Sequence, residues 1–432
     1  MNLGGKAMKR FLIVLLSVIA MTWPVVAAAA PQATPSERVR RNVVVRDAPN
    51  GSAQPIEALG RGETLEVVGE VPGWYRVQLP DGRIGYVSKA WTIVREEAVA
   101  AAGTGPFRMH VIDVGTGLAV FVEGPDFTLL YDAGSQDDLA TGPDNRVVAY
   151  IRAVRPDLRT IDHLVLSHPH KDHVELMPDV FDAFVIRNVW DSGAVNQTRG
   201  YCRFLRAVAA ETGVRYHDAI ASNEVHRVTF SGGSCSGTVE IQAAEQMSAD
   251  PVPLGAGASM AILYRDASHH SDPNENTVVV RLDLGGRRIL LAGDAEGGGR
   301  QLPSSPPAAG SIEDWLLNHD RAAVAADVLV VGHHGSLTSS RRAFLDAVGA
   351  TRFIISSGPH PYQSVRLPDP EIVTELESRG TLLRTDVDDE ACGHATAKPG
   401  PDNDESPGGC SNILVTVSGG QITGPAYHPV AD

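Results

Sequence analysis

Four potential metal ligands lie within a run of six residues that directly follows an apolar stretch. The apolar stretch is His163-Leu-Val-Leu166, and the run after it is Ser167-His-Pro-His-Lys-Asp-His173. The apolar residues predict a short buried strand, so the ligands begin where that strand ends. Three imidazoles and a carboxylate crowded at one strand end are costly unless a cation lies among them. Imidazole nitrogen and carboxylate oxygen are preferred ligands of zinc, manganese and iron, so the sequence predicts a metal site here.

The spacing of these ligands favours two adjacent ions over one. His168 and His170 can point to one side of the run, whereas Asp172 and His173 can point to the other. The alternative is a surface loop that happens to be rich in histidine, but such a loop does not explain the preceding strand. We therefore predict that these four residues bind two divalent metal ions, zinc or manganese.

Further candidate ligands follow two other apolar stretches. Asp294 ends Leu290-Leu-Ala-Gly-Asp294, and we expect its two oxygens to bridge the two metals, with an exposed turn as the alternative. His333 and His334 end Val330-Val-Gly-His-His334, and at least one of them should reach the site. The sequence leaves open which of the two is the ligand.

Other polar residues are candidates for supporting roles. Asp132 and Asp113 follow or end apolar stretches, and we expect each to orient a metal-bound histidine or to pin a loop. A purely structural turn role is nearly as well supported for both. Asp172 is expected to orient the nucleophile as well as bind metal. Ser336, with the helix that begins near Ser340, is expected to hold an anionic oxygen of the substrate, because helix N-termini offer free N–H groups. Arg341 and Arg342 could add positive charge near this oxygen, but a place on the solvated surface is the preferred expectation for each.

The run His168-Pro-His-Lys-Asp-His173 resembles the signature of the metallo-β-lactamase superfamily. Five other motifs occur with it in one order along the chain. They are Asp113-Val-Gly-Thr-Gly117, Tyr131-Asp-Ala-Gly-Ser135, Asn274-Glu-Asn-Thr-Val-Val-Val280, Leu291-Ala-Gly-Asp-Ala-Glu296 and Gly332-His-His-Gly-Ser336. The series resembles the metallo-β-lactamase domain of the DNA-uptake competence protein ComEC and its relatives, over residues 107 to about 390. The resemblance implies hydrolysis by a metal-activated hydroxide, most of all of phosphoester bonds, as in a phosphodiesterase or nuclease-like enzyme.

The expected elements fit the fold that this resemblance implies. Strands are expected over residues 107–114, 118–123 and 128–132, and helices over 144–155 and 199–213. A second set has strands over 277–284, 288–292 and 328–332, followed by helices from 311, over 340–348 and over 369–379. Two halves that each run from strands to helices predict an α/β fold, the αββα sandwich in which two sheets face each other.

Two positions depart from the superfamily pattern. Members often carry a further histidine before the bridging aspartate, but this chain has Asn274-Glu-Asn276, with His269 and His270 just upstream in a polar loop. Relatives also tend to have His-Pro on the C-terminal side, where this chain has Arg366-Leu-Pro368. His360 lies in the preceding loop. The sequence leaves open whether His269, His270 or His360 completes the second metal site.

The first 30 residues read as a secretory signal peptide. Lys6, Lys9 and Arg10 precede the apolar run Phe11–Met21, and residues 25–30 offer small-residue cleavage sites. The alternative is an uncleaved anchor helix. We expect an exported protein, periplasmic or secreted, with no stable membrane span after cleavage.

Residues 39–95 predict a small all-β domain that follows a Pro/Ala linker at 31–38. Two alternating stretches flank Pro80-Asp-Gly82, which is a strong hairpin signal. The order of its motifs resembles a bacterial SH3 domain: Val43-Val-Val-Arg-Asp-Ala-Pro49, Leu59-Gly-Arg-Gly-Glu63, Gly73-Trp-Tyr-Arg-Val77 and Gly85-Tyr-Val87. Such modules often bind cell-wall peptides, and a packed spacer without a ligand is an equal alternative. Trp74 and Trp91 are expected in the core. The hydrolase domain is expected over 107–432.

Cysteine content and charge constrain the remaining choices. The four cysteines favour two disulfides in an exported protein, and we expect Cys392–Cys410 first, with Cys202–Cys235 then following. The formal net charge of −15 does not support binding of nucleic acid, which usually requires a basic face. We expect a phosphoester or another small or oligomeric substrate of the cell envelope. The alternatives are another hydrolase of the superfamily, such as a lactonase or lactamase, and a non-catalytic envelope-binding protein with a structural metal site.

Overall fold

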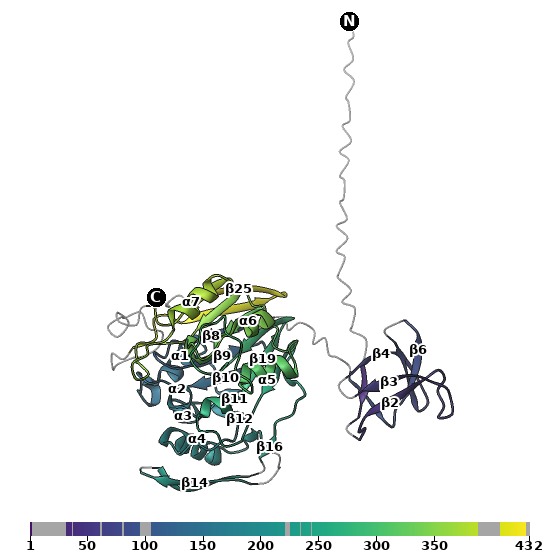
Figure 1. Cartoon of the computed structure of the whole chain (residues 1–432), viewed down its shortest axis with the longest axis horizontal. Coiled ribbons are helices and arrows are strands. Elements are labelled where there is room, and N and C mark those ends of the chain that lie inside the picture. Colours follow the sequence, from purple (N-terminus) through teal and green to yellow (C-terminus); the bar gives the residue numbers. More distant parts are fainter. Residues whose placement is uncertain are drawn as a thin grey trace. The chain divides into compact units, whose positions relative to one another are not determined.

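The chain forms two compact units, residues 1–99 and residues 100–432, in a computed structural model (Figure 1). The structure describes residues 1, 32–36, 38–60, 63–79, 82–95, 105–220, 225–233, 235–242, 244–387 and 407–428. The predicted signal peptide lies outside the described residues except for Met1. In the part of the chain that is described, no helix is both long and apolar enough to cross a bilayer.

The first unit is an all-β domain built on one sheet in the order β3-β2-β6-β5-β4-β1-β7. Buried valines alternate with exposed residues along its strands, as in Val43 and Val45, and together they form a small core. Two expectations were wrong. Part of the expected linker is a strand, β1, which pairs with β4 and β7, and Trp91 is 52 % exposed. The strands are β1 (Gln32–Pro35), β2 (Asn42–Arg46), β3 (Pro55–Gly60), β4 (Leu65–Val71), β5 (Trp74–Gln78), β6 (Ile84–Ser88) and β7 (Thr92–Arg95).

The second unit contains two large mixed sheets. The first has the order β16-β13-β12-β11-β10-β9-β8-β24-β25, and its strands β10 to β13 run parallel. Their carboxyl ends therefore lie at one edge of the sheet. The strands are β8 (Phe107–Val111), β9 (Ala119–Glu123), β10 (Thr128–Ala133), β11 (Thr160–Leu166), β12 (Val185–Asp191), β13 (Arg215–Asp218), β16 (Glu245–Gln246), β24 (Ile413–Ser418) and β25 (Gln421–Tyr427).

The second sheet has its strands in chain order, from β17 to β23. Strands β20 to β23 are parallel, so their carboxyl ends also meet at one edge. The strands are β17 (Val252–Gly255), β18 (Ala258–Tyr264), β19 (Val279–Leu284), β20 (Arg287–Leu291), β21 (Val328–Val330), β22 (Arg352–Ile355) and β23 (Thr381–Arg384).

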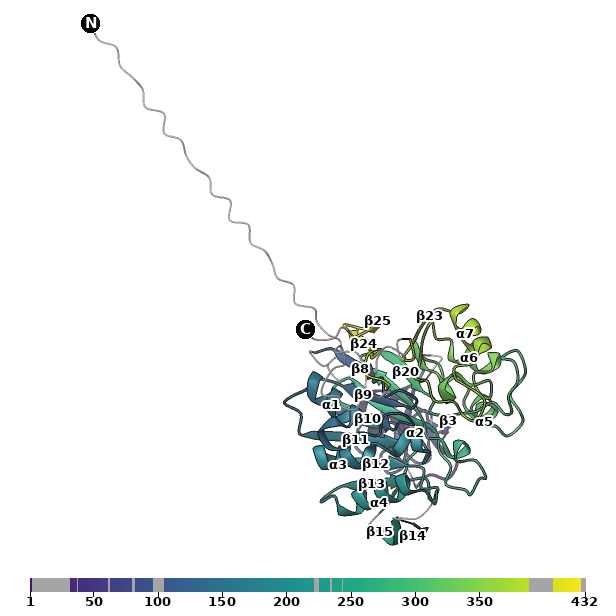
Figure 2. The same ribbon diagram turned by 90° about the vertical axis from the view of Figure 1, so that its left-hand side faces the viewer.

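Helices cover the outer face of each sheet, which makes the predicted αββα sandwich. Figure 2 shows α1 and α3 on one side of the strands and α5, α6 and α7 on the opposite side. One apolar cluster packs the first sheet against its helices, a second lies between the sheets, and a third packs the second sheet against its helices. The helices are α1 (Arg146–Val154), α2 (Lys171–Val174), α3 (Met177–Ala183), α4 (Arg199–Ala210), α5 (Ile312–His319), α6 (Arg342–Val348) and α7 (Pro370–Glu377).

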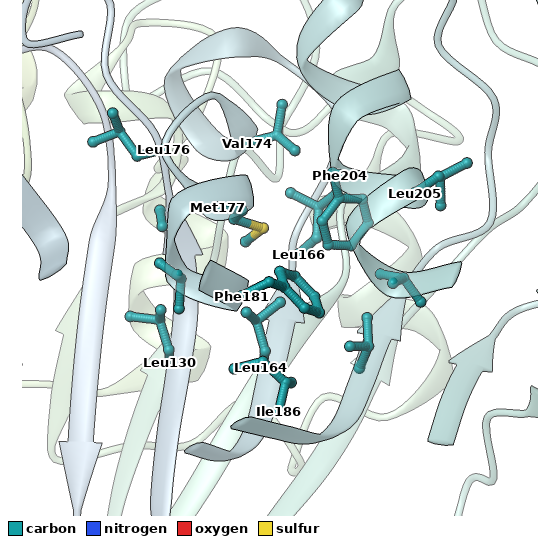
Figure 3. Packing of buried hydrophobic residues seen from close by; sticks show 14 of the residues in the cluster. Leu130, Leu164, Leu166, Val174, Leu176, Met177, Phe181, Ile186, Phe204 and Leu205 are labelled. Carbon is teal, nitrogen blue, oxygen red and sulfur yellow. The ribbon is translucent and has the colours of Figure 1, made fainter. Parts of the chain in front are cut away.

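The strands in the middle of the first sheet are apolar on both faces because both faces are covered. In β10, Leu130 packs toward the helices, whereas Leu129 and Tyr131 pack toward the second sheet. Figure 3 shows Phe181 of α3 beside Leu164 of β11 and Phe204 of α4 beside Leu166 of the same strand. Each fully buried side chain of this size contributes roughly 1.5–3 kcal/mol relative to an exposed one. This packing holds the carboxyl edges rigidly in place.

A hairpin beside α4 lies outside the two large sheets. It consists of β14 (His226–Gly232) and β15 (Cys235–Ile241). A disulfide joins Cys202 of α4 to Cys235 of β15, as the sequence predicted with lower preference. The preferred pairing, Cys392–Cys410, has Cys392 outside the described residues.

Candidate metal centre

The candidate ligands come from strand ends in both sheets and converge where the two carboxyl edges face each other. His168 follows β11, Asp294 follows β20, and His333 and His334 follow β21. The short helix α2 begins directly after His170 and carries Asp172 and His173. Residues up to 166 positions apart in the chain are thereby brought into one buried cluster.

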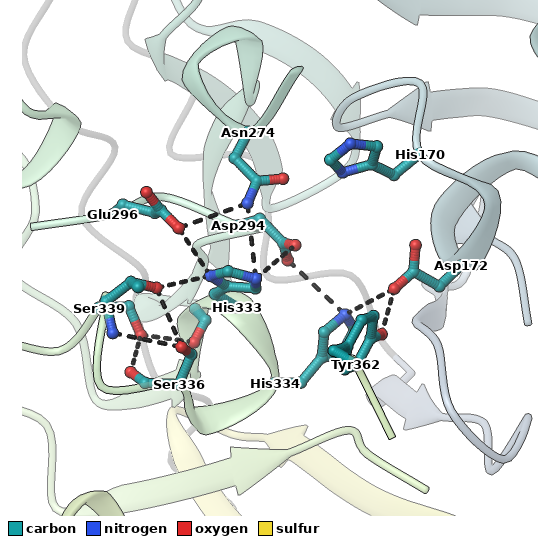
Figure 4. A network of polar contacts seen from close by, with 12 residues as sticks. His170, Asp172, Asn274, Asp294, Glu296, His333, His334, Ser336, Ser339 and Tyr362 are labelled. Atoms are coloured by element: carbon teal, nitrogen blue, oxygen red, sulfur yellow. Dashed lines mark hydrogen bonds and ion pairs between the residues drawn. The ribbon is translucent and has the colours of Figure 1, made fainter. Parts of the chain in front are cut away.

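The carboxylate of Asp294 lies at the centre of this cluster (Figure 4). Its Oδ1 is 3.3 Å from His173 Nε2 and 3.8 Å from His334 Nε2. Its Oδ2 is 3.6 Å from His168 Nε2 and 3.8 Å from His333 Nε2. Each oxygen therefore faces its own pair of imidazole nitrogens. This arrangement is the one that the bridging role predicted for Asp294 requires.

The remaining ligand candidates divide unequally between the two sides. His168 Nε2 is 3.0 Å from His170 Nδ1, so these two rings lie together as expected. Asp172 Oδ2 is 3.5 Å from His334 Nε2 on the other side. His173 takes part in both groups of close ligand atoms, one with His168 and Asp294 and the other with Asp172 and His334. The spacing predicted His168 and His170 on one side and Asp172 and His173 on the other. The structure has His168, His170 and Asp172 on these sides, whereas His173 is close to ligand atoms on both.

Several ligand atoms are buried without a hydrogen-bond partner among the described residues. They are His173 Nε2, His334 Nε2 and Asp294 Oδ1. A buried polar atom without a partner costs about 1–3 kcal/mol, so three around one point require a compensating group. Imidazole nitrogens and carboxylate oxygens that converge on a shared space fit a divalent cation. The residues present thus fit the metal that the sequence predicted.

Charge within the cluster shifts the titration of its members. Burial raises the pKa of Asp294, but the nearby His173, His333 and His334 outweigh it and hold that pKa well below its usual range. Burial likewise raises the pKa of Asp172, yet its contact with His334 keeps the pKa below the ordinary value. Both carboxylates are therefore ionised and available to a cation.

Asp132 orients His173 from behind. Its Oδ2 lies 2.8 Å from His173 Nδ1, and its Oδ1 accepts the Ser167 N–H at 2.6 Å. Asp132 adopts a φ of 58°, a left-handed conformation that costs a non-glycine residue about 1–3 kcal/mol. Because the carboxylate engages Nδ1, Nε2 of His173 is the nitrogen directed at Asp294. This position agrees with the orienting role expected for Asp132.

Both histidines of the Gly332–Gly335 turn reach the cluster. His333 and His334 have φ values of 49° and 51°, and these left-handed conformations send the two rings to different sides. His334 Nδ1 donates to the Ser356 carbonyl at 2.8 Å, so its Nε2 faces Asp172. His333 Nδ1 lies 2.7 Å from Thr338 Oγ1 and 2.9 Å from Glu296 Oε1. The structure therefore places both rings beside Asp294, where the sequence required only one.

The structure places the two supporting candidates Ser336 and Asp113 in structural contacts. Ser336 is buried, and its Oγ accepts from Arg300 Nη1 at 3.3 Å and from the Thr338 N–H at 3.2 Å. Ser336 therefore holds Thr338, whose hydroxyl contacts His333. Asp113 accepts the Ser411 N–H at 2.9 Å and pins the segment that precedes β24. Burial raises the pKa of Asp113 to about 6. Of the two roles expected for Asp113, orienting a histidine or pinning a loop, the structure shows the second.

The basic residues after Ser336 are engaged in structural contacts. Arg341 is buried and its guanidinium donates to the carbonyls of Gly299 and Gln301, so the expectation that it is solvated was wrong. Arg342 pairs with Glu375 at 2.8 Å on the outer face. Helix α6 begins only at Arg342.

The histidines that were left open have other partners. His270 contacts Asp266 at 2.8 Å and Glu275 at 2.9 Å, while His269 is exposed. His360 is half-exposed and lies 3.6 Å from Asp137. At the position of the missing histidine, Asn274 Nδ2 is 3.4 Å from His333 Nε2. The amide of Asn274 and the ring of His333 thus occupy that side of the site.

Tyr362 is the member of the site that sequence reasoning missed. Its hydroxyl donates to Asp172 Oδ2, and its ring stacks on His334 at a centroid distance of 6.1 Å (Figure 4). It lies two residues beyond His360, in the loop that contains this candidate histidine. No local pattern marks it, since a tyrosine in a Pro-rich loop has no ligand spacing.

Comparison with known families agrees with this fold. The family described as Metallo-beta-lactamase superfamily matches residues 112–360, and the bacterial SH3 domain family matches residues 41–93. The chain belongs to the metallo-beta-lactamase superfamily, a family of metallohydrolases, and carries a bacterial SH3 domain ahead of the hydrolase fold.

Individual relatives confirm the resemblance to ComEC-like proteins. The chain is 26 % identical over 283 residues to the competence protein ComA of Neisseria gonorrhoeae. This alignment covers 64 % of this chain and 30 % of that protein. It is 24 % identical over 276 residues to the ComE operon protein 3 of Bacillus subtilis, and that alignment covers 60 % of this chain and 30 % of the relative. The chain thus spans less than a third of the length of these relatives. Among solved structures, the metallo-beta-lactamase fold protein YhfI of Bacillus subtilis aligns with a TM-score of 0.39 and 14 % identity, over 65 % of this chain and 97 % of that one.

Proposed function

We propose that this protein hydrolyses phosphoester bonds in the cell envelope, as a phosphodiesterase or nuclease-like enzyme with two divalent ions, zinc or manganese. The single observation that carries the proposal is the position of Asp294, whose two oxygens each face a separate pair of imidazole nitrogens. A carboxylate between two sets of ligands is what a pair of adjacent ions requires. Such pairs are typical of phosphatases and nucleases.

His168, His170 and His333 would hold one ion, Asp172, His173 and His334 the other, and Asp294 would bridge them. When bound, the ions would supply Lewis acidity, which activates water and neutralises charge on the attacked group. The protein residues supply position and access. Asp132 and the Ser356 carbonyl hold the rings of His173 and His334. The His170 side chain is 34 % exposed, so the substrate approaches from its side.

Asp172 has a second role in this proposal. One of its oxygens accepts the Tyr362 hydroxyl and lies near His334, which fixes the plane of the carboxylate. Because its pKa is held below the usual value, Asp172 stays an acceptor through the neutral range. It can therefore orient the water that attacks the substrate.

The proposal is tested with full-length protein that is purified without added metal. We expect metal analysis to find close to two equivalents of divalent ion. With zinc or manganese, we expect turnover of bis(p-nitrophenyl) phosphate but not of nitrocefin or a simple lactone. His168→Ala and Asp294→Ala should each reduce turnover at least a hundredfold. The matched control is His319→Ala, which removes an exposed histidine of α5.

Each alternative predicts a different result. Turnover of the lactone or the β-lactam without the diester would point to another hydrolase of the superfamily. Full metal loading without turnover of any substrate would point to a structural metal site in a non-catalytic protein. One equivalent of metal, with activity retained, would contradict the two-ion arrangement.

We further propose that residues 39–95 bind a cell-wall peptide and keep the exported enzyme at the envelope. Exposed apolar side chains of this unit support it, namely Trp91 at 52 % and Ile93 at 40 % exposure. Full-length protein should sediment with purified cell-wall sacculi, and Trp91→Ala should weaken this at least threefold. Leu302→Ala removes an equally exposed apolar residue of the hydrolase unit and serves as the control.

A further inference from the structure

A pocket of ≈ 410 Å³ lies beside the candidate metal centre. Its walls come from the segments that follow β12 and β13, from the start of β14 and from the loop over residues 267–276. Pro169, which stands between His168 and His170, also lines it. The volume is in the range of pockets that hold a single small organic group.

The topology explains why the pocket and the metal ligands are neighbours. Strands β11, β12 and β13 are parallel, so the segments after them leave the sheet at the same edge. The side chain of Asn196, after β12, donates to the Pro169 carbonyl at 3.0 Å. The pocket wall is thus bonded directly to the loop that carries the first metal ligands.

One buried side chain in this pocket has an unused polar atom. His226 is 7 % exposed and lines the pocket, and its Nε2 has no hydrogen-bond partner among the described residues. Its Nδ1 lies 3.3 Å from Asp218 Oδ2. The ring of Tyr216 packs against the imidazole, with 5.4 Å between the two ring centroids. Because Nδ1 faces the carboxylate, Nε2 is the ring nitrogen that is turned away from Asp218. Such a buried atom calls for a ligand group that forms a hydrogen bond with it.

The charges around His226 exclude an anionic ligand in the pocket itself. Asp218 is buried beneath it, Arg227 at the rim is paired with Glu240 at 2.7 Å, and His270 is paired with Asp266. We propose that this pocket is a subsite for a neutral, hydroxyl-bearing ring attached to the phosphoester, as in a nucleoside or a sugar phosphate. A ring hydroxyl, which can donate or accept, forms a hydrogen bond with His226 Nε2 while the phosphate lies at the metal centre. This subsite rests on the proposed function.

The hairpin of β14 and β15 supplies one wall of the subsite and is fastened to the fold. The disulfide Cys202–Cys235 ties it to α4, and Arg206 Nη2 donates to the Ser236 carbonyl at 2.6 Å. Gln197 Nε2 donates to the Thr229 carbonyl at 3.1 Å. His226 is therefore held in place before a ligand arrives, which lowers the ordering cost of binding.

Two diesters with the same leaving group test the subsite. They are the p-nitrophenyl ester of thymidine 5′-phosphate, which has the ring, and methyl p-nitrophenyl phosphate, which lacks it. We expect the metal-loaded wild type to prefer the ring ester in kcat/KM. His226→Phe should reduce kcat/KM for the ring ester about tenfold and leave the methyl ester unchanged, as expected for one lost hydrogen bond. Val195→Trp, at the exposed rim of the pocket, should have the same selective effect without disturbing the core.

Binding of free rings provides a readout that needs no turnover. Saturation-transfer NMR with thymidine and with N-acetylglucosamine should detect at least one of them on the wild type, which identifies the source of the ring. The signal should be lost in His226→Phe and kept in His319→Phe. The thermal midpoint of each variant shows that it is folded.

The outcomes separate the two proposals. Equal kcat/KM for both esters in the wild type, or equal loss for both in the variants, would overturn the subsite and leave the phosphoester activity standing. Hydrolysis of neither ester would overturn the proposed function, and the subsite would then stand or fall on ring binding. No binding of either ring would overturn the subsite.

Discussion

Tyr362 donates its hydroxyl hydrogen to Asp172, and this contact joins a loop of the second half of the hydrolase unit to the run of candidate metal ligands in the first half. The tyrosine lies 190 residues after the aspartate. Burial, together with the neighbouring Asp172, raises the pKa of Tyr362 above its ordinary value, so the phenol stays protonated and remains a donor. The same ring stacks on His334. Tyr362 thus positions two ligands of the candidate site at once.

Replacing Tyr362 tests this positioning role. Tyr362→Phe keeps the ring stack but removes the donor, so we expect kcat to fall about tenfold, the value of one lost hydrogen bond to a charged group. KM and bound metal should change little, because the ligands themselves remain. Steady-state kinetics and metal analysis measure the three quantities. Tyr264→Phe is the control, since it removes a hydroxyl that donates to the Glu275 carbonyl. Equal effects of the two variants would contradict a specific role for Tyr362.

The carboxylate behind His173 should govern metal affinity. Asp132→Asn removes the charge that holds His173 Nδ1, and loss of such a partner typically weakens metal binding 10- to 100-fold. Competition with a chromogenic chelator measures the affinity. Asp113→Asn is the matched control, because Asp113 is equally buried but pins the segment before β24. The orienting role is wrong if Asp132→Asn binds metal as tightly as the wild type.

Buried histidines should make the fold sensitive to acid. His217 stacks on Trp190 at 3.8 Å, and burial lowers its pKa to about 4, although Glu245 acts in the opposite direction. Between about pH 6.5 and 4 the unfolded chain binds this proton and the folded chain does not. The stability that the neutral ring contributes is therefore present above pH 6.5 and is lost as the pH falls through this window.

His217→Phe should reduce this loss of stability. The variant keeps a flat ring on Trp190 but cannot bind a proton, so its urea midpoint should fall less between pH 7 and pH 4.5 than that of the wild type. His319→Phe is the control, because His319 also stacks on a tryptophan, Trp315 at 4.1 Å, but is exposed. The same pH dependence in His217→Phe and the wild type would show that another group governs acid sensitivity.

The disulfide should stabilise the hairpin wall more than the rest of the unit. Cys202 and Cys235 are separated by 33 residues, and closing a loop of this length contributes about 3–4 kcal/mol by the chain-entropy account. The double variant Cys202→Ser/Cys235→Ser should lose stability of this order in urea unfolding. Hydrogen exchange should speed up first in residues 226–241. Uniform acceleration across the unit would mean that the bond stabilises the whole fold instead.

Local patterns in the sequence predicted the type of several main elements and the candidate chemistry of the site. The alternation and length of the apolar runs identified strands such as β10 and β19, because a covered sheet requires apolar residues wherever a strand is buried. The run from His168 to His173 predicted candidate metal ligands, and the structure brings His168 and His173 together with Asp294. The family followed from the order of such motifs, and both family comparisons agree.

Partners that lie far apart in the chain were decided only by the tertiary structure. Strand β24 pairs with β8 across some 300 residues, and Tyr362 reaches Asp172 across 190. The left-handed conformations of His333 and His334, which send both rings to Asp294, depend on the turn that the folded sheet imposes. The position of His226 in the pocket beside the candidate metal centre depends on the parallel strands, which place its hairpin at the same edge of the sheet. A sequence pattern reports the local conformation and chemistry of a segment, whereas these contacts depend on how whole sheets pack, and no neighbouring residue encodes that.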